Sequence, residues 1–95
     1  MQFSRDLRDR VADGEITLTI RLWSRPQVKV GGRYQVLART IEVDEVELVP
    51  FSSITRADLK RAGETDREVM RDLVAHAGPV EDDTLVYRIE FHVAE

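Results

Sequence analysis

The chain has 95 residues, of which 42% are hydrophobic and 34% charged, with a net charge of −4 at pH 7. These values are typical of one small folded domain over residues 1–95 and exclude a disordered chain, and the absence of cysteine excludes disulfides, thiolate metal sites and a thiol nucleophile. Because no apolar run has the length of a signal or membrane-spanning segment, the sequence predicts a cytoplasmic protein without a membrane partner.

The first predicted element is a short amphipathic helix over residues 3–12. Phe3, Leu7 and Val11 recur every four residues, which places them on one helix face. Gly14 is expected to end the helix, because glycine readily adopts the left-handed conformation found just after a helix. The helix therefore presents one narrow apolar face to a core.

A strand is predicted next, over residues 15–23, because apolar and polar side chains alternate there. The apolar face comprises Ile16, Leu18, Ile20 and Leu22. The other face comprises Thr17, Thr19, Arg21 and Trp23. Two hydroxyls, a guanidinium and an indole in a row suit a polar ligand that has a planar or anionic part. These four residues are therefore candidate ligand-binding residues.

Positive charge is concentrated around this strand. Residues 16–41 contain no Asp or Glu but five basic residues, namely Arg21, Arg25, Lys29, Arg33 and Arg39. A cationic island in an acidic chain is expected to attract an anionic ligand. Lys29 and Arg33 flank a turn at Gly31-Gly32, so they are predicted to form part of the rim of the site.

Two further strand regions follow this turn. Residues 33–38 alternate between apolar and polar side chains. Residues 40–49 are rich in β-branched residues, but the phase of their alternation changes near Asp44-Glu45. One extra residue there would bring both halves onto the same face, so we predict a β-bulge. Bends of this kind are typical of strongly curved sheets.

Two helices are predicted after these strands. Thr55 with Asp58 three residues later is typical of a helix start, and Gly63 is expected to end that helix. Thr65 and Glu68 have the spacing of a capping box that starts the next helix. The buried face of this second helix is predicted to comprise Val69, Leu73 and either His76 or Ala77.

The last predicted strand covers residues 84–93. One face is apolar, and the other carries Arg88, Glu90 and His92. Arg88 is a further candidate ligand-binding residue. The two histidines, His76 and His92, lie too far apart for a recognisable zinc signature, so no metal or cofactor is predicted.

Strands and helices without regular βαβ alternation predict an α+β fold with a mostly antiparallel, curled sheet. Five short motifs occur along the chain in this order: GEITLTIR at 14–21, KVGG at 29–32, IEVD at 41–44, ITRAD at 54–58 and YRIEF at 87–91. Together they resemble the ASCH domain of the PUA-like superfamily. The resemblance implies a curled β-barrel of about five to six strands with about three short helices, and a cleft that binds RNA or a nucleotide-like molecule.

Some members of that superfamily are small amidohydrolases that act on N4-acetylcytidine and use a lysine, a threonine and a glutamate. The threonine position matches Thr19, but the lysine position falls on Ile16, which cannot abstract a proton. The glutamate position falls near Ala62, and Glu64 lies close enough to substitute for it. The resemblance therefore favours binding over catalysis, and leaves open a role for Lys29 reaching in from the turn.

Three functions stay open at this point. The first is binding of RNA or a nucleotide in a compact basic cleft, with Arg21 as anchor, Thr19 as hydrogen-bonding group and Trp23 as stacking surface. The second is hydrolysis of a modified nucleoside with Thr19 as nucleophile. The third is self-association through a sheet edge, as a monomer in equilibrium with a weak homodimer. The structural alternatives are an ion pair of Arg21 with Glu90 or Glu42, and burial of Trp23 in the core.

Overall fold

A computed structural model describes residues 2–75 and 78–94 of the chain. The elements in chain order are α1 (Arg5–Ala12), β1 (Leu18–Arg21), β2 (Arg33–Val36), β3 (Arg39–Pro50), the 3-10 helix η1 (Phe51–Ser53), α2 (Arg56–Arg61), α3 (Arg67–Val74) and β4 (Leu85–Val93). This arrangement confirms the predicted α+β class. None of the helices in the described ranges has the length and apolarity needed to cross a membrane.

The strands form one antiparallel sheet in the order β1-β4-β3-β2. Among the described residues this sheet has four strands and stays open, which corrects the prediction of a five- to six-stranded barrel. The predicted strand over residues 40–49 is part of a single 12-residue strand, β3, which continues through the bulge. Residues 22–32 contain Pro26 and the Gly31-Gly32 turn, and they form a long connection outside the sheet.

The predicted β-bulge is confirmed. The register of β3 against β4 shifts between Val43 and Glu45, so Asp44 is the extra residue on β3. Val43 lies opposite Phe91 and Val46 lies opposite Ile89, and both apolar pairs therefore share one face of the sheet. The bulge thus reconciles the two phases of the sequence pattern.

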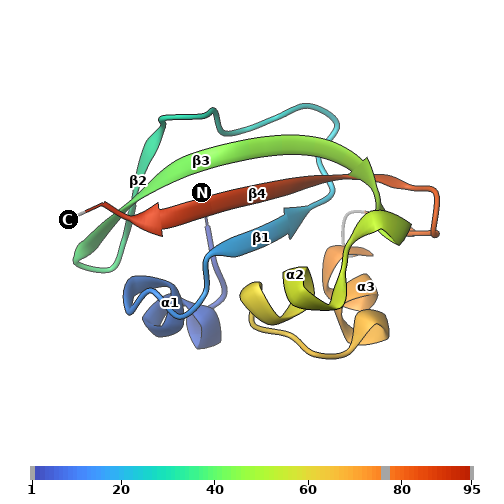
Figure 1. Ribbon diagram of the computed structural model, residues 1–95, viewed down its shortest axis with the longest axis horizontal. Helices are drawn as coiled ribbons and strands as arrows, with labels where there is room; N and C mark the ends of the chain where they lie inside the picture. The colour runs from blue at the N-terminus through green and yellow to red at the C-terminus, as the bar shows by residue number, and fades with distance from the viewer. Residues whose placement is uncertain (1, 76–77, 95) are drawn as a thin grey trace.

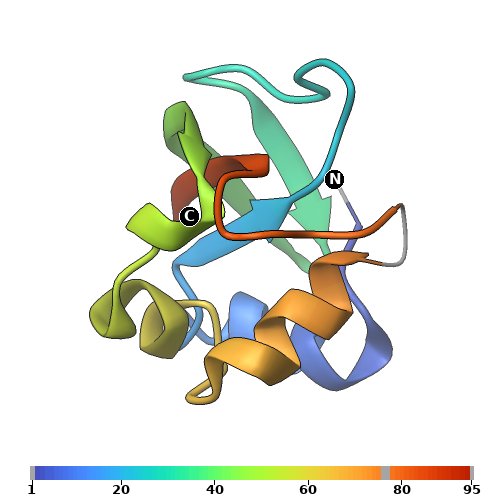
Figure 2. The ribbon, with the colours of Figure 1, turned by 90° about the vertical axis from the view of Figure 1, so that its right-hand side faces the viewer.

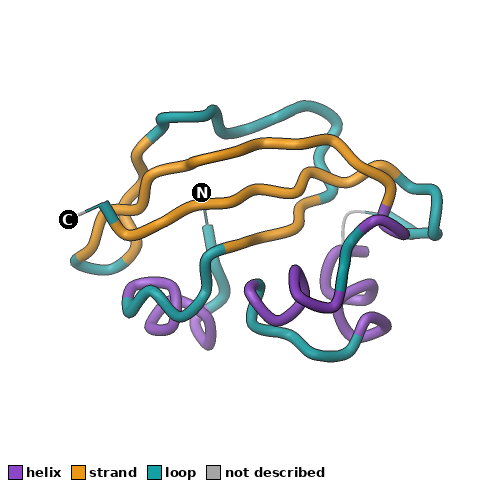
Figure 3. Tube along the Cα trace, viewed as in Figure 1, coloured by secondary structure: helices purple, strands orange, loops and turns teal. Residues whose placement is uncertain are grey.

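The helices gather along the β1 side of the sheet in two groups (Figures 1 and 2). The first group is α1, which packs against β2 and β3, and the second is the α2–α3 pair, of which α2 packs against β1 (Figure 3). Around α1, Phe3 and Val11 pack with Phe91. Around the other group, buried residues of β1, η1, α2, α3 and the η1–α2 connection form a second cluster, which includes Leu18, Ile20, Phe51, Ile54, Leu59, Met70 and Val74.

The predicted start of α2 is confirmed, whereas the predicted start of α3 is one residue too early. Thr55 and Asp58 form a reciprocal capping box at α2. At α3 the N-cap is Asp66, one residue after the predicted Thr65, and its carboxylate accepts the N–H groups of the first turn.

The predicted buried face of α3 is also wrong. Val69 and Leu73 are exposed, and the buried residues are Met70 and Val74. These four residues form one broad apolar stripe on α3. Residues of α2 and the sheet cover the side of the stripe that carries Met70 and Val74. The predicted positions His76 and Ala77 lie outside the described residues.

The first strand is shorter than predicted, because its ends leave the ladder. Residues 15–23 were expected, but only Leu18–Arg21 pair with β4. The carbonyl oxygen of Thr17 still accepts the N–H of Phe91 at 3.0 Å, but the N–H of Thr17 donates to the carbonyl oxygen of Arg61 at 3.0 Å, which ties the chain to the end of α2. The strand β1 forms one edge of the sheet, and its start lies between the two groups of helices (Figure 1).

Candidate ligand-binding cleft

A cleft of about 200 Å³ lies at the outer edge of β1, between the two groups of helices. We call it the Arg21 cleft. Its polar lining comprises Gln2, Ser4, Thr19, Arg21 and Glu64. Its apolar lining comprises Phe3, Leu7, Ile20, Ala62, Met70 and Leu73. The cleft therefore pairs a polar floor on β1 with apolar walls from α1, the preceding segment and α3.

Arg21 is held on the floor of this cleft by neutral groups. Its Nε donates to the hydroxyl of Thr19 at 3.0 Å, and its Nη2 donates to the carbonyl oxygen of Gln2. The guanidinium carbon lies 5.0 Å from the ring centre of Phe3 and 5.9 Å from that of Trp23, within cation–π range. These contacts fix the orientation of the guanidinium without neutralising its charge.

No carboxylate within residues 2–75 and 78–94 pairs with Arg21. The expected structural partners are occupied elsewhere: Glu90 pairs with Arg61 at 2.8 Å, and Glu42 pairs with Arg33 at 3.0 Å. The ion-pair alternative for Arg21 is therefore wrong. An arginine side chain stays protonated in proteins, so Arg21 carries a positive charge that no ion pair within the described residues compensates.

Burial lowers the pKa of Arg21 below its ordinary value, because removing the guanidinium from water penalises its charged form. A buried charge normally has a partner of opposite sign, since an unpaired one is costly. An anionic or strongly accepting group of a ligand would supply that partner. The physical state of Arg21 thus points to the chemistry that the cleft is suited to bind.

Thr19 and Glu64 face the same cleft from different elements. Thr19 is only 9% exposed, and its hydroxyl accepts from Arg21, so the hydroxyl hydrogen remains available to donate to a ligand. Glu64 follows α2, and its Oε1 accepts the backbone N–H groups of Thr65 at 2.8 Å and Asp66 at 3.2 Å. These bonds hold the carboxylate on the α2–α3 connection at the wall of the cleft.

A second hollow, of about 410 Å³, continues on the other side of Arg21. Its lining includes Gln2, Trp23 and Val28. The indole of Trp23 is half-buried and packs at 6.0 Å from the ring centre of Tyr87. Trp23 packs against an apolar cluster, as the structural alternative predicted, and it also lines the hollow next to Arg21. Its role as a stacking surface stays a prediction.

The other predicted site residues lie elsewhere. The Thr17 hydroxyl accepts a hydrogen bond from Arg61 Nε at 3.0 Å. Lys29 is exposed in the turn before Gly31, and Arg33 is 64% exposed in its pair with Glu42. None of these three residues lines the Arg21 cleft or the hollow beside Trp23.

Arg88 lies on the sheet face opposite Arg21. Arg21 is paired across the ladder with Tyr87, so the next residue of β4 points to the other side. The guanidinium of Arg88 contacts three carboxylates: Asp58 at 2.7 Å, Glu90 at 2.6 Å and Glu47 at 3.1 Å. Its hydrogen bond lowers the pKa of Asp58 to about 2, and the same guanidinium also lowers the pKa of Glu90. The charge of Arg88 is therefore compensated by carboxylates of the protein.

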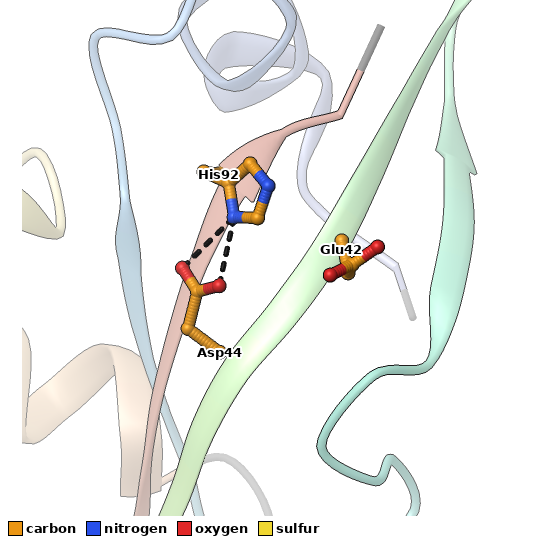
Figure 4. Close-up of side chains that lie close together, drawn as sticks. All are labelled: Glu42, Asp44 and His92. Carbon is orange, nitrogen blue, oxygen red and sulfur yellow. Dashed lines mark hydrogen bonds and ion pairs between the residues drawn. The ribbon is translucent and has the colours of Figure 1, made fainter.

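Figure 4 shows a group of metal-ligand types at the far end of β3 and β4. His92 Nδ1 lies 2.8 Å and 3.0 Å from the two carboxylate oxygens of Asp44, and Glu42 stands nearby on β3. Asp44 and His92 are exposed, and Glu42 already accepts from Arg33. We assign this group the role of a surface hydrogen-bonding cluster, which the bulge at Asp44 brings together.

The sequence pattern did not identify several residues of the Arg21 cleft. Gln2 and Phe3 precede α1 and gave no motif, although Phe3 was recognised as apolar. Met70 and Leu73 belong to α3, whose predicted orientation was wrong. The common cause is that these residues reach β1 through packing of helices that are distant in the chain, which no local periodicity reports.

Solved structures that share this fold include an ASCH domain from Lactobacillus crispatus JV V101. It superposes with a TM-score of 0.77 at 17% sequence identity, over 93% of this chain and 70% of that one. A DUF984 protein from Enterococcus faecalis V583 superposes with a TM-score of 0.72 at 16% identity, over 94% of this chain and 67% of that one. No protein-family model matches the sequence, and no curated protein is detectably similar to it.

At these identities the likeness establishes the fold. The chain has the fold of ASCH domains, as the five motifs predicted. The similarity to amidohydrolases stays a prediction from the sequence.

Proposed function

We propose that this chain binds single-stranded RNA or a nucleotide-like molecule in the Arg21 cleft. One observation carries the proposal: Arg21 is a partly buried cation that neutral groups hold in place and that has no carboxylate partner among the described residues. A phosphate oxygen or the acceptor edge of a base would complete its hydrogen bonding and offset its charge.

The surroundings of Arg21 supply the remaining contacts that a nucleotide needs. Nη1 of Arg21 has no acceptor among the described residues, so it is available to a ligand oxygen. The Thr19 hydroxyl can donate a second hydrogen bond. Leu7 and Leu73 offer apolar surface to the face of a base, and Trp23 offers an aromatic surface beside Arg21.

The distribution of charge favours approach of an anion from the Arg21 side. Carboxylates gather on the Arg88 side of the sheet, at Glu42, Glu45, Glu47, Asp58 and Glu90. The connection after β1 carries cations and no acid. Such a separation orients an incoming anion and raises its local concentration near the cationic side. The RNA binding that the ASCH resemblance implies agrees with this arrangement.

Hydrolysis finds less support in the same cleft. A threonine nucleophile needs an adjacent base, and Thr19 instead accepts a hydrogen bond from a cation. The cleft has no lysine in its described lining, and Ile16 is buried in the core. The carboxylate of Glu64 lines the cleft, but its Oε1 is engaged by two backbone N–H groups. We therefore propose binding rather than catalysis.

The test is a titration of a fluorescently labelled, mixed-sequence single-stranded RNA against the wild-type chain and Arg21→Met, followed by fluorescence anisotropy. We expect the substitution to weaken binding by about tenfold or more, because it removes the charge-assisted hydrogen bonds to the ligand. Measurements at about 50 mM and 200 mM salt should show weaker binding at the higher salt.

The matched control is Arg33→Ala, which removes the same charge from an exposed position on the opposite face of the sheet. This variant should bind RNA as the wild type does. Absence of binding by the wild type, or equal binding by Arg21→Met, would contradict the proposed function.

A further inference from the structure

A third hollow adjoins the Arg21 cleft and shares Gln2 and Phe3 with it. It has a volume of about 330 Å³, and its lining also includes Arg8, Gln35 and Leu37. We call it the Leu37 hollow. Because the segment at Gln2 borders both spaces, a chain-like ligand anchored at Arg21 can extend past this segment into the Leu37 hollow.

The polar groups of the Leu37 hollow are suited to a nucleotide. Arg8 is exposed, and its Nε donates to the carbonyl oxygen of Phe3 at 3.0 Å. Within the described part of the chain Arg8 pairs with no carboxylate, so the rest of its guanidinium is free to contact a phosphate. The amide nitrogen of Gln35 donates to the carbonyl oxygen of Leu37 at 3.1 Å, which leaves the amide oxygen of Gln35 as an acceptor.

Leu37 occupies an unusual position for a leucine. It lies in the two-residue turn between β2 and β3, with φ at +56° and half of its surface exposed. This left-handed conformation is unfavourable for residues with a side chain and is normally taken by glycine or asparagine. Neither the turn geometry nor burial favours leucine at this position, so the left-handed backbone of Leu37 lowers the stability of the fold. Such strained positions occur preferentially at sites of function.

We propose that the Leu37 hollow is a second nucleotide subsite, next to the Arg21 cleft, on one continuous surface for single-stranded RNA. In this arrangement Leu37 packs against the face of a base and Arg8 contacts the phosphate that links it to the nucleotide at Arg21. Apolar side chains that contact or separate bases are a recurrent device of nucleic-acid-binding proteins. The proposal rests on the proposed function of the Arg21 cleft and assigns it a ligand longer than one nucleotide.

The test compares two probes: an equimolar mixture of nucleoside 5′-monophosphates, and a labelled pool of single-stranded RNA tetranucleotides of random sequence. We expect the wild-type chain to bind the tetranucleotides about tenfold more tightly than the monophosphates. Leu37→Gly should remove most of this gain and leave binding of the monophosphates unchanged. Because glycine is favoured at this φ, Leu37→Gly should also keep or raise the free energy of unfolding, which excludes misfolding as the cause.

Arg8→Gln gives an independent measurement. It should lower the slope of log K against log salt concentration for the tetranucleotides by about 0.7, the value for one phosphate contact in a single strand. Arg5→Gln, on the same helix but outside the hollow, and Leu85→Ala, an equally exposed leucine on β4, are the matched controls. Both should behave as the wild type.

The outcomes separate the two proposals. Binding of monophosphates without a gain for tetranucleotides, or a gain that survives both Leu37→Gly and Arg8→Gln, would overturn the second subsite and leave the Arg21 cleft intact. Absence of binding of either probe by the wild type would overturn both.

Discussion

Arg21 and Arg88 lie on neighbouring strands of the same sheet, yet they are in opposite electrostatic states. Arg88 contacts Asp58, Glu47 and Glu90 and is 15% exposed. Arg21 is held by a hydroxyl, a backbone carbonyl and two aromatic rings, and no carboxylate in the described part of the chain contacts it. The charge of Arg88 is thus compensated by the protein itself, whereas the charge of Arg21 is left for a ligand.

The two sides of the sheet explain this difference. Residues next to each other on a strand point to opposite faces, and the carboxylates of β3, β4 and α2 gather on the face of Arg88. Arg21 points to the other face, at an edge strand, where the groups that contact its guanidinium are neutral and Glu64 at the wall of the cleft forms no ion pair with it. The face of Arg88 therefore stabilises the fold by ion pairing. On the opposite face, the edge strand β1 presents the cation of Arg21 to a cleft.

The largest expected effect on stability comes from removing Arg88, the arginine that contacts three carboxylates. Arg88→Met should lower the free energy of unfolding by about 3 kcal/mol, because it leaves the buried carboxylate of Asp58 without its ion-pair partner. Urea unfolding followed by circular dichroism measures this. Arg33→Ala, which breaks an exposed pair, should change stability by less than about 1 kcal/mol. Equal losses in the two variants would show that the Arg88 network does not stabilise the fold.

The network also predicts a dependence of stability on pH. In the folded protein the pKa of Asp58 is about 2, below its ordinary value of 3.8. Its carboxylate therefore stabilises the fold fully above about pH 4, and this stabilisation is lost as the pH falls through 2. Between pH 5 and pH 2 the free energy of unfolding should fall by about 2 kcal/mol from this residue.

Asp58→Asn is the control for the pH effect. This variant should be less stable than the wild type at pH 5, and the difference should shrink toward pH 2, as measured by urea unfolding at both values. A difference that stays constant between these pH values would show that the pKa of Asp58 is not lowered by folding.

The smallest expected effect on stability comes from the unpaired arginine. Arg21→Met should change the free energy of unfolding by less than about 1 kcal/mol, since methionine can fill the space beside Phe3 and Trp23 and the uncompensated charge disappears. The same variant should lose RNA binding. A loss of stability as large as that of Arg88→Met would instead assign Arg21 a structural role.

Local patterns in the sequence predicted much of the fold. The capping residues Thr55 and Asp58, the glycine after each of the first two helices and the phase change at Asp44 all act through neighbours a few residues away. The motifs also predicted the ASCH fold. The errors included the length of β1, the buried face of α3 and the number of strands, which depend on how distant segments pack.

The candidate site divided in the same way. Alternation along β1 predicted that Thr19, Arg21 and Trp23 share a face, and the structure places them around one guanidinium. Periodicity did not reveal that Arg88 forms ion pairs on the opposite face of the sheet. It also did not reveal that Gln2 and Leu73 line the Arg21 cleft.

The amino-acid sequence by itself determined the order and type of most helices and strands, which side chains alternate on β1 and β3, and where positive charge is concentrated. Only the tertiary structure decided which arginine meets carboxylates and which does not. Hydrogen bonds and ion pairs act over a few ångströms, and the residues that form them here come from elements far apart in the chain. Sheet register and helix packing bring those residues together, and neither is encoded in any single stretch of the sequence.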